Sequence, residues 1–123
     1  MSYIVELYEK DNGRTPVSEF VERLNVKQRE KILRAFELLE EFGSEFHYPD
    51  VDVIRGKKYQ GLWELRVAFA SDIYRIFYYV TNDNVAVLLH GIVKKQQKTP
   101  AKELDVALNR MNDDIWRKNN EAE

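Results

Sequence analysis

The sequence predicts an α+β fold of order β-α-α-β-β-β-α, with helices covering one face of a mostly antiparallel sheet. Apolar residues recur at helical spacing over 15–43, and short apolar strands separated by polar turns fill 61–93. A second helical pattern follows Thr99-Pro100. With 123 residues, 44% of them hydrophobic and 12% aromatic, the chain suffices for one folded domain, expected to span 1–123.

Turn-forming and helix-capping residues mark the end of the first strand and the start of the first helix. Residues 3–8 alternate weakly, which favours a strand ended by Asp11-Asn12-Gly13. Thr15 is a suitable N-cap and Pro16 suits the first helical position. The apolar stripe of this helix consists of Val17, Phe20, Val21 and Leu24.

A second helix should follow with almost no connector, forming an αα-hairpin. Asn25 and Gln28 have the spacing of a capping box, and Gly43 occupies the usual position of a C-terminal glycine. The stripe between them consists of Ile32, Ala35, Phe36, Leu39 and Phe42.

Three strands are expected in the second half of the chain, at about 62–69, 73–80 and 85–93. Ser71-Asp72 and residues 81–84 supply the turns. Val51 and Val53 suggest one more short strand, although Pro49 and Gly56 weaken that interpretation.

The last helix begins at Thr99-Pro100 and is expected to fray from about residue 117. Its apolar stripe consists of Leu104, Ala107, Leu108, Met111 and Ile115.

Composition restricts the chemistry. The chain has no cysteine and only two isolated histidines, His47 and His90, so we expect neither a metal site nor a cofactor. It has no signal region at its beginning and no apolar run near ~20 residues, so we expect a cytoplasmic protein without a membrane contact. The net charge is −2, yet residues 55–98 hold eight Lys/Arg and three acids. Such a local excess of positive charge suits a phosphate ligand.

Hairpin geometry predicts which charged side chains share a sheet face. With Ser71-Asp72 as a two-residue turn, Ala68 lies opposite Arg75, and a tight turn at 81–84 places Arg75 opposite His90. One face then carries Glu64, Arg66, Arg75, His90 and Lys94. The other face becomes the core and carries Trp63, Leu65, Val67, Phe69, Tyr74, Ile76, Tyr78, Val80, Val87 and Leu89. The opposite parity would bury two unpaired arginines, at several kcal/mol each.

Purely structural roles are an alternative to a functional role for these charged residues. Charges on an open sheet face are ordinary, and an ion pair of Glu64 with Arg66 or Arg75 contributes only ~0–1 kcal/mol when solvated. A strand histidine is more often hydrogen-bonded than catalytic. A functional role is favoured because several kinds of residue gather in one region: the loop lysines flank the strands that bear the arginines. A base could also stack on Phe77 or Tyr79 beside those arginines.

Three segments in order, GLWELRV, YRIFYYV and LLHGIVKKQQKTPAKELDVAL, resemble the RelE/HigB superfamily of bacterial toxins. The similarity is greatest to phage-derived HigB-like toxins. It implies the toxin of a type II toxin–antitoxin system, an endoribonuclease that cleaves mRNA in the ribosomal A site. It also implies a cognate antitoxin partner, often a helix-turn-helix protein.

The resemblance implies roles for residues that match its pattern. Arg75 corresponds to an arginine at the scissile phosphate, and Glu64 and Arg66 lie in a strand that carries catalytic side chains. The catalytic candidates are thus Arg75, Glu64, Arg66, His90, Lys94 and Lys95. The RNA-binding candidates are Arg55, Lys57, Lys58, Lys98, Phe77 and Tyr79.

Cleavage by the RNA's own 2′-OH needs a base, cations at the phosphate and an acid for the 5′-oxygen. Arg75 suits the phosphate because its planar fork bonds two oxygens. The base could be Glu64 or a lysine, and the acid could be His90 or Lys95. A departure from the family is the lack of any tyrosine after Tyr79. A non-catalytic RNA- or protein-binding module, or a purely structural interaction domain, remains an alternative.

Overall fold

A computed structural model describes residues 1–94 and 98–121 and confirms the α+β class. Its five-stranded sheet has the order β1-β5-β4-β3-β2, in which only β1 and β5 run parallel. The short segment at Val51–Val53 is indeed a strand and adds an edge to the predicted sheet. The strands are β1 (Ile4–Leu7), β2 (Val51–Val53), β3 (Trp63–Phe69), β4 (Asp72–Val80) and β5 (Val85–Lys94).

The two N-terminal helices, α1 (Pro16–Glu22) and α2 (Val26–Phe42), begin and end where local signals indicate. The capping box is present in full, because Asn25 and Gln28 each accept the other's backbone N–H at 2.9 Å. Gly43 ends α2 with a φ of 52°. A Cβ there would lie 1.9 Å from the carbonyl oxygen of Met1, so glycine also admits the N-terminal segment.

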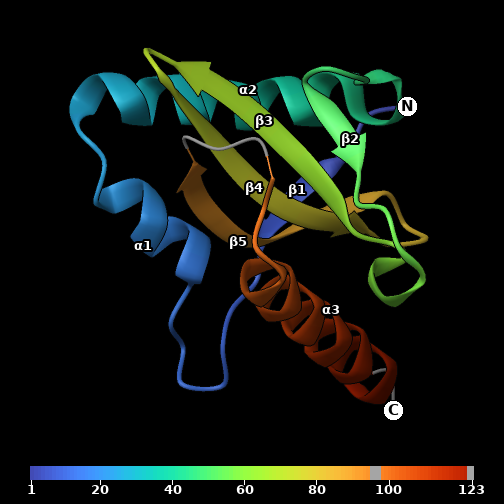
Figure 1. Cartoon of the computed structure of the whole chain (residues 1–123). Coiled ribbons are helices and arrows are strands. Elements are labelled where there is room, and N and C mark those ends of the chain that lie inside the picture. The colour runs from blue at the N-terminus through green and yellow to red at the C-terminus, as the bar shows by residue number, and fades with distance from the viewer. Residues whose placement is uncertain (95–97, 122–123) are drawn as a thin grey trace.

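Helices cover both faces of the sheet, which corrects the prediction that they cover one. The first core lies between the sheet and α1 and α2, and includes Ile32, Leu39, Leu65 and Ile76. A second core on the other face packs against α3 (Ala101–Glu121). Figure 1 shows α2 running along the sheet and α3 projecting from the opposite end of the molecule. The face predicted to be open is therefore covered in part.

The predicted register of β3 and β4 is wrong by two residues. The turn is Ala70-Ser71, and Ala70 adopts a φ of 55°. Arg66 therefore lies opposite Arg75. A slip of two residues leaves every side chain on its predicted face, because side chains alternate with a period of two.

The pairing of β4 with β5 contains a bulge next to Phe77 and Tyr78. His90 faces Phe77 instead of Arg75, which lies opposite Ile92. The shared face of Glu64, Arg66, Arg75, His90 and Lys94 is confirmed by this register. The assignment of Val87 and Leu89 to the first core is wrong, and both belong to the second core. Val80 pairs with Ala86, one residue away from the predicted register, and this shift changes the parity of Val87.

Helix α3 continues to Glu121, beyond residue 117 from which fraying was predicted. Ala107 and Met111 are buried as expected, whereas Ile115 is 38% exposed. Asp114 is buried in its place. Within the part of the chain that the structure describes, no helix combines the length and the apolarity that crossing a bilayer requires.

Candidate functional site

A hollow of about 570 Å³ opens where β2, β3 and β4 meet. We call it the arginine hollow, and its lining residues are Tyr48, Asp52, Arg55, Arg66, Ile73 and Arg75. Strand register creates it, because Arg66 lies opposite Arg75 while Asp52 lies opposite Glu64. Directly opposed residues point to the same side of a sheet, so residues of three strands converge here.

A chain of ion pairs connects the charged groups of the arginine hollow. Glu64 Oε1 accepts from Arg75 at 2.6 Å, and Glu64 Oε2 accepts from Arg66 at 3.1 Å. Asp52 Oδ2 then lies 3.4 Å from Arg66 and 3.2 Å from Arg55. Side-chain exposure rises along this series of ion pairs, from 6% at Arg75 through 27% at Arg66 to 79% at Arg55. The series of ion pairs thus connects the buried guanidinium of Arg75 to the exposed guanidinium of Arg55.

The carboxylates of this chain position the guanidinium groups. Both oxygens of Glu64 are engaged by arginine N–H groups, and the residue is only 3% exposed. Burial would raise the pKa of Asp52, but hydrogen bonds from Arg55 and from the Val53 backbone, together with nearby Arg66, hold it below its ordinary 3.8. Three arginines against two carboxylates leave the arginine hollow with an excess positive charge.

Tyr48 forms the rim of the arginine hollow and was not anticipated. Its side chain is 66% exposed, and the Arg66 guanidinium lies over its ring, 5.6 Å from the centroid. The residue precedes β2 in a segment without periodicity, so only the fold brings it to the arginines. An exposed ring backed by a guanidinium is a suitable surface for stacking a nucleobase.

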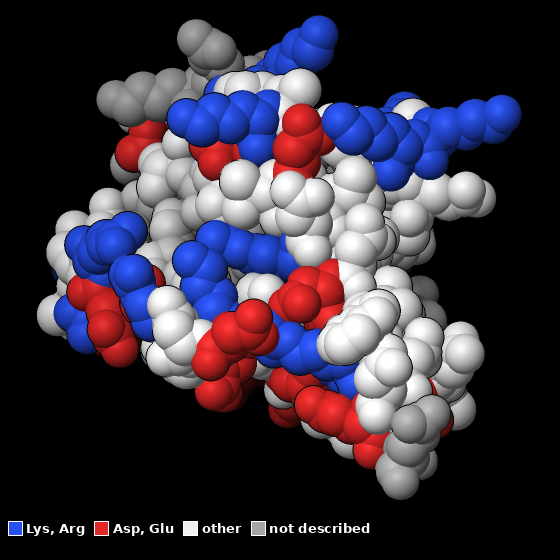
Figure 2. All heavy atoms as spheres, turned by 90° about the horizontal axis from the view of Figure 1, so that it is seen from below, with Lys and Arg blue, Asp and Glu red and all other residues white. Residues whose placement is uncertain are grey.

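The predicted lysines fall at different distances from the arginine hollow. Lys94 lies opposite Ile73, which lines it. Lys58 is bound elsewhere, 2.9 Å from Asp105 of α3, and Lys57 and Lys98 are exposed. Lys95 lies outside the described residues. Figure 2 shows long cationic side chains at the upper edge of its view, whereas the lower half interleaves both charges.

His90 shares the sheet face of Arg75 but lines a different pocket. Its Nδ1 accepts a hydrogen bond from Arg110 at 3.1 Å, so Nε2 carries the proton and donates to Glu103 at 2.8 Å. Both partners belong to α3, and His90 lines a separate pocket between α1 and α3.

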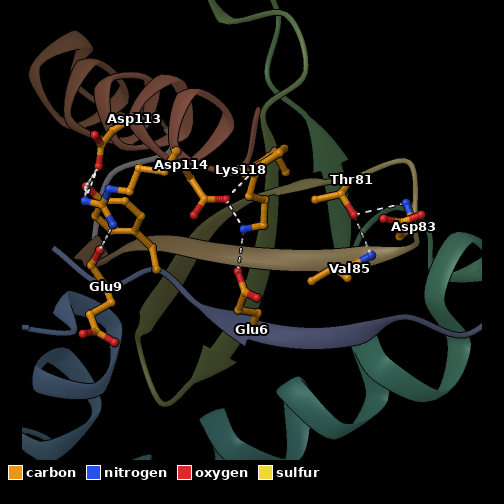
Figure 3. Close-up of polar contacts among 11 residues, drawn as sticks. Glu6, Glu9, Thr81, Asp83, Val85, Asp113, Asp114 and Lys118 are labelled. Atoms are coloured by element: carbon orange, nitrogen blue, oxygen red, sulfur yellow. Dashed lines mark hydrogen bonds and ion pairs between the residues drawn. The ribbon is translucent and has the colours of Figure 1, made fainter. Parts of the chain in front are cut away.

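Phe77 and Tyr79 lie under α3, so the prediction that their rings are open to a base is wrong. Phe77 is 0% and Tyr79 6% exposed. The Tyr79 hydroxyl donates to Asp114, which also pairs with Lys118. Burial and the Asp114 carboxylate both raise the pKa of Tyr79, so it stays protonated. Figure 3 shows Lys118 between Asp114 and Glu6 of β1, a contact that joins α3 to the sheet edge.

The protonation of His90 predicts a pH-dependent stability. Burial is the main cause that lowers the pKa of His90 below its ordinary 6.5, and the Arg110 charge adds to it, against the opposing Glu103. Below pH 6.5 the unfolded chain therefore takes up a proton that the folded chain resists. We expect the free energy of unfolding to fall from about pH 6.5 downward, by at most about 1.4 kcal/mol per pH unit.

His90→Gln keeps an acceptor and a donor but does not titrate, so this slope should disappear. The measurement is urea unfolding between pH 7.5 and 5.5, where His47 is common to both proteins. Equal slopes in the two proteins would contradict the assignment.

Among residues 1–94 and 98–121, no group of three His, Cys, Asp or Glu side chains is placed to hold a metal ion. The polar groups of the arginine hollow are cations and their carboxylate partners. What the hollow can do is bind an anion and stabilise charge on it.

Fold and site together define a small α+β protein with a hollow on its sheet that is lined by three arginines. The chain belongs to a family described as Phage derived protein Gp49-like (DUF891), whose model matches residues 19–112. This family is related to RelE/HigB-type toxins and is compatible with the toxin of a toxin–antitoxin pair. No protein of curated function matches the chain in sequence.

Proposed function

We propose that this protein is the toxin of a type II toxin–antitoxin system and cleaves mRNA on the ribosome. The observation that carries the proposal is the arginine hollow, where a buried arginine and a half-exposed one are held by a shared carboxylate. Guanidinium groups arranged in this way offer paired N–H donors to a phosphate. Membership of a family related to such toxins supports the same conclusion.

In the proposed reaction, the 2′-OH of the RNA attacks the neighbouring phosphorus. A bond forms between phosphorus and the 2′-oxygen while the bond to the 5′-oxygen breaks, which yields a 2′,3′-cyclic phosphate and a 5′-hydroxyl. Arg75 and Arg66 stabilise the negative charge that develops on the non-bridging oxygens. Tyr48 stacks a base beside the phosphate, and exposed Arg55 binds the RNA backbone.

Two lysines, Lys94 of β5 and Lys95 next in the sequence, carry the proton transfers in this proposal. Glu64 is occupied by Arg66 and Arg75, and His90 is bound to Glu103 and Arg110. Lys94 and Lys95 therefore take the roles of base and acid, one removing the 2′-OH proton and the other protonating the 5′-oxygen. Glu64 acts as a positioning residue for the two arginines.

The proposal is tested by expression in a bacterium and by primer extension on ribosome-bound mRNA. The wild-type protein should stop growth and create new mRNA 5′ ends, and Arg66→Ala should lower the cleavage rate about 10²-fold. Arg34→Ala removes an exposed arginine from α2 and should cleave like wild type. Absence of ribosome-dependent cleavage by the wild-type protein would reject the proposal.

A non-catalytic RNA-binding module is the second candidate, and one observation favours it. Arg75 is 5% exposed and its predicted acid partner His90 lies in another pocket. Growth arrest without new mRNA ends would select this candidate. A neighbouring reading frame for a helix-turn-helix protein that neutralises the arrest would identify the antitoxin partner in either case.

A further inference from the structure

We infer that the chain has a second anion site between α1 and α3, which binds a backbone phosphate of the same RNA. The inference rests on the proposed function for the identity of the ligand, but its geometry is separate. The pocket has a volume of about 230 Å³. Its lining consists of Lys10, Arg14, Pro16, Glu19, Phe20, Arg23, His90, Gly91 and Arg110.

Arg110 is the fixed element of this second anion site. One of its nitrogens donates to the Leu89 carbonyl at 2.9 Å and to His90 Nδ1 at 3.1 Å, which anchors the guanidinium on β5. Within the described part of the chain, no carboxylate oxygen lies within 4.0 Å of it. Burial lowers the pKa of Arg110, against the opposing influence of Tyr8, Glu103 and Glu19. A half-buried cation that makes no ion pair within 4.0 Å is a favourable place for an anion, although Glu103 and Glu19 offset part of its charge.

Further cations surround the same pocket. Arg14 is paired with Glu19 through two hydrogen bonds, at 2.8 and 2.9 Å. Lys10 and Arg23 also act on the Glu19 carboxylate and help to lower its pKa, so they lie close to it. Neither of them has an ion-pair partner among the described residues. Four cations line the pocket against one lining carboxylate, Glu19, and the neighbouring Glu103 that is bonded to His90, so an excess of positive charge remains.

The apolar wall of the pocket gives it a fixed shape. Phe20 of α1 approaches the backbone of β5 so closely that a Cβ on Gly91 would lie 2.6 Å from its ring. Glycine at this position therefore allows α1 to sit against β5. The close packing of Phe20 against Gly91 thereby fixes the position of Lys10 and Arg14, before α1, relative to Arg110 of α3.

A polynucleotide is the occupant that the arrangement favours. His90 of the second anion site lies opposite Phe77, two residues from Arg75 on the same face of β4. The two sites are thus one strand apart. An RNA strand that leaves the arginine hollow presents another phosphate at each nucleotide, so one ligand can contact both sites. An acidic peptide lacks this regular spacing of charge.

The test measures how salt weakens the binding of a single-stranded RNA to the full chain. The probe is a 2′-O-methylated oligonucleotide, which lacks the attacking hydroxyl and cannot be cleaved. Each phosphate contact contributes about 0.7 to the slope of log K against log salt. Lys10→Ala/Arg23→Ala should reduce the steepness of this slope by about 1.4, the sum for two lost contacts.

Lys27→Ala/Arg34→Ala is the matched control, because it removes the same charges from exposed positions of α2. Its slope should equal that of wild type. The inference is overturned if the oligonucleotide does not bind, if both double variants change the slope equally, or if neither does. It is also overturned in favour of an acidic protein partner if polyglutamate, but not RNA, binds through Lys10 and Arg23. The cleavage rate of Arg66→Ala tests the proposed function separately, because it does not depend on Lys10 or Arg23.

Discussion

Arg75→Lys is expected to lower the rate of mRNA cleavage by about 10²–10³-fold. The substitution preserves the positive charge beside Glu64 but removes the planar fork that can bond two phosphate oxygens. The lysine side chain is also shorter than that of arginine, so its ammonium group cannot contact Glu64, as Arg75 does at 2.6 Å, and reach the phosphate at the same time. The measurement is single-turnover cleavage of mRNA on stalled ribosomes, which reports the chemical step.

Folding must be excluded as the cause of this loss. The free energy of unfolding of Arg75→Lys, from urea titration, should lie within about 1.5 kcal/mol of wild type, because charge pairing with Glu64 is retained. Wild-type cleavage by a folded Arg75→Lys protein would mean that Arg75 has only a structural role.

Glu64→Ala is expected to lower the free energy of unfolding by about 3–5 kcal/mol. The carboxylate is buried and shared by two guanidinium groups, so its removal leaves Arg75 buried without its 2.6 Å partner. Urea unfolding checks the result. Glu37→Ala, on the exposed surface of α2, should change stability by less than about 0.5 kcal/mol.

A double-mutant cycle separates the ion pair from the volume lost in Glu64→Ala. Arg75→Met removes the buried charge while filling similar space, so the two substitutions together should cost less than the sum of each alone. If Glu64→Ala lowered the free energy of unfolding by less than about 1 kcal/mol, the ion pair would behave as a solvent-exposed one and not as a buried one.

Local signals explain what could be predicted about the fold. The capping box at Asn25 and Gln28 depends on residues three apart, and it forms as expected. The common face of Glu64, Arg66 and Arg75 follows from alternation, which survives the two-residue error in register. A one-residue shift is different, because it reverses parity. Near the turn the β4–β5 register differs from the predicted one by one residue, which places Val87 in the second core, and the bulge then returns His90 to its predicted face.

The sequence by itself therefore determined the elements, their order and the side of the sheet on which the arginines lie, because caps and alternation act between near neighbours. Only the tertiary structure decided where α3 packs, and this placement buried Phe77 and Tyr79 and bound His90 to Glu103 and Arg110. It likewise brought Tyr48 over Arg66 and set α1 against Gly91. These contacts join residues distant in the chain, so they depend on the docking of whole elements, for which local spacing carries no signal.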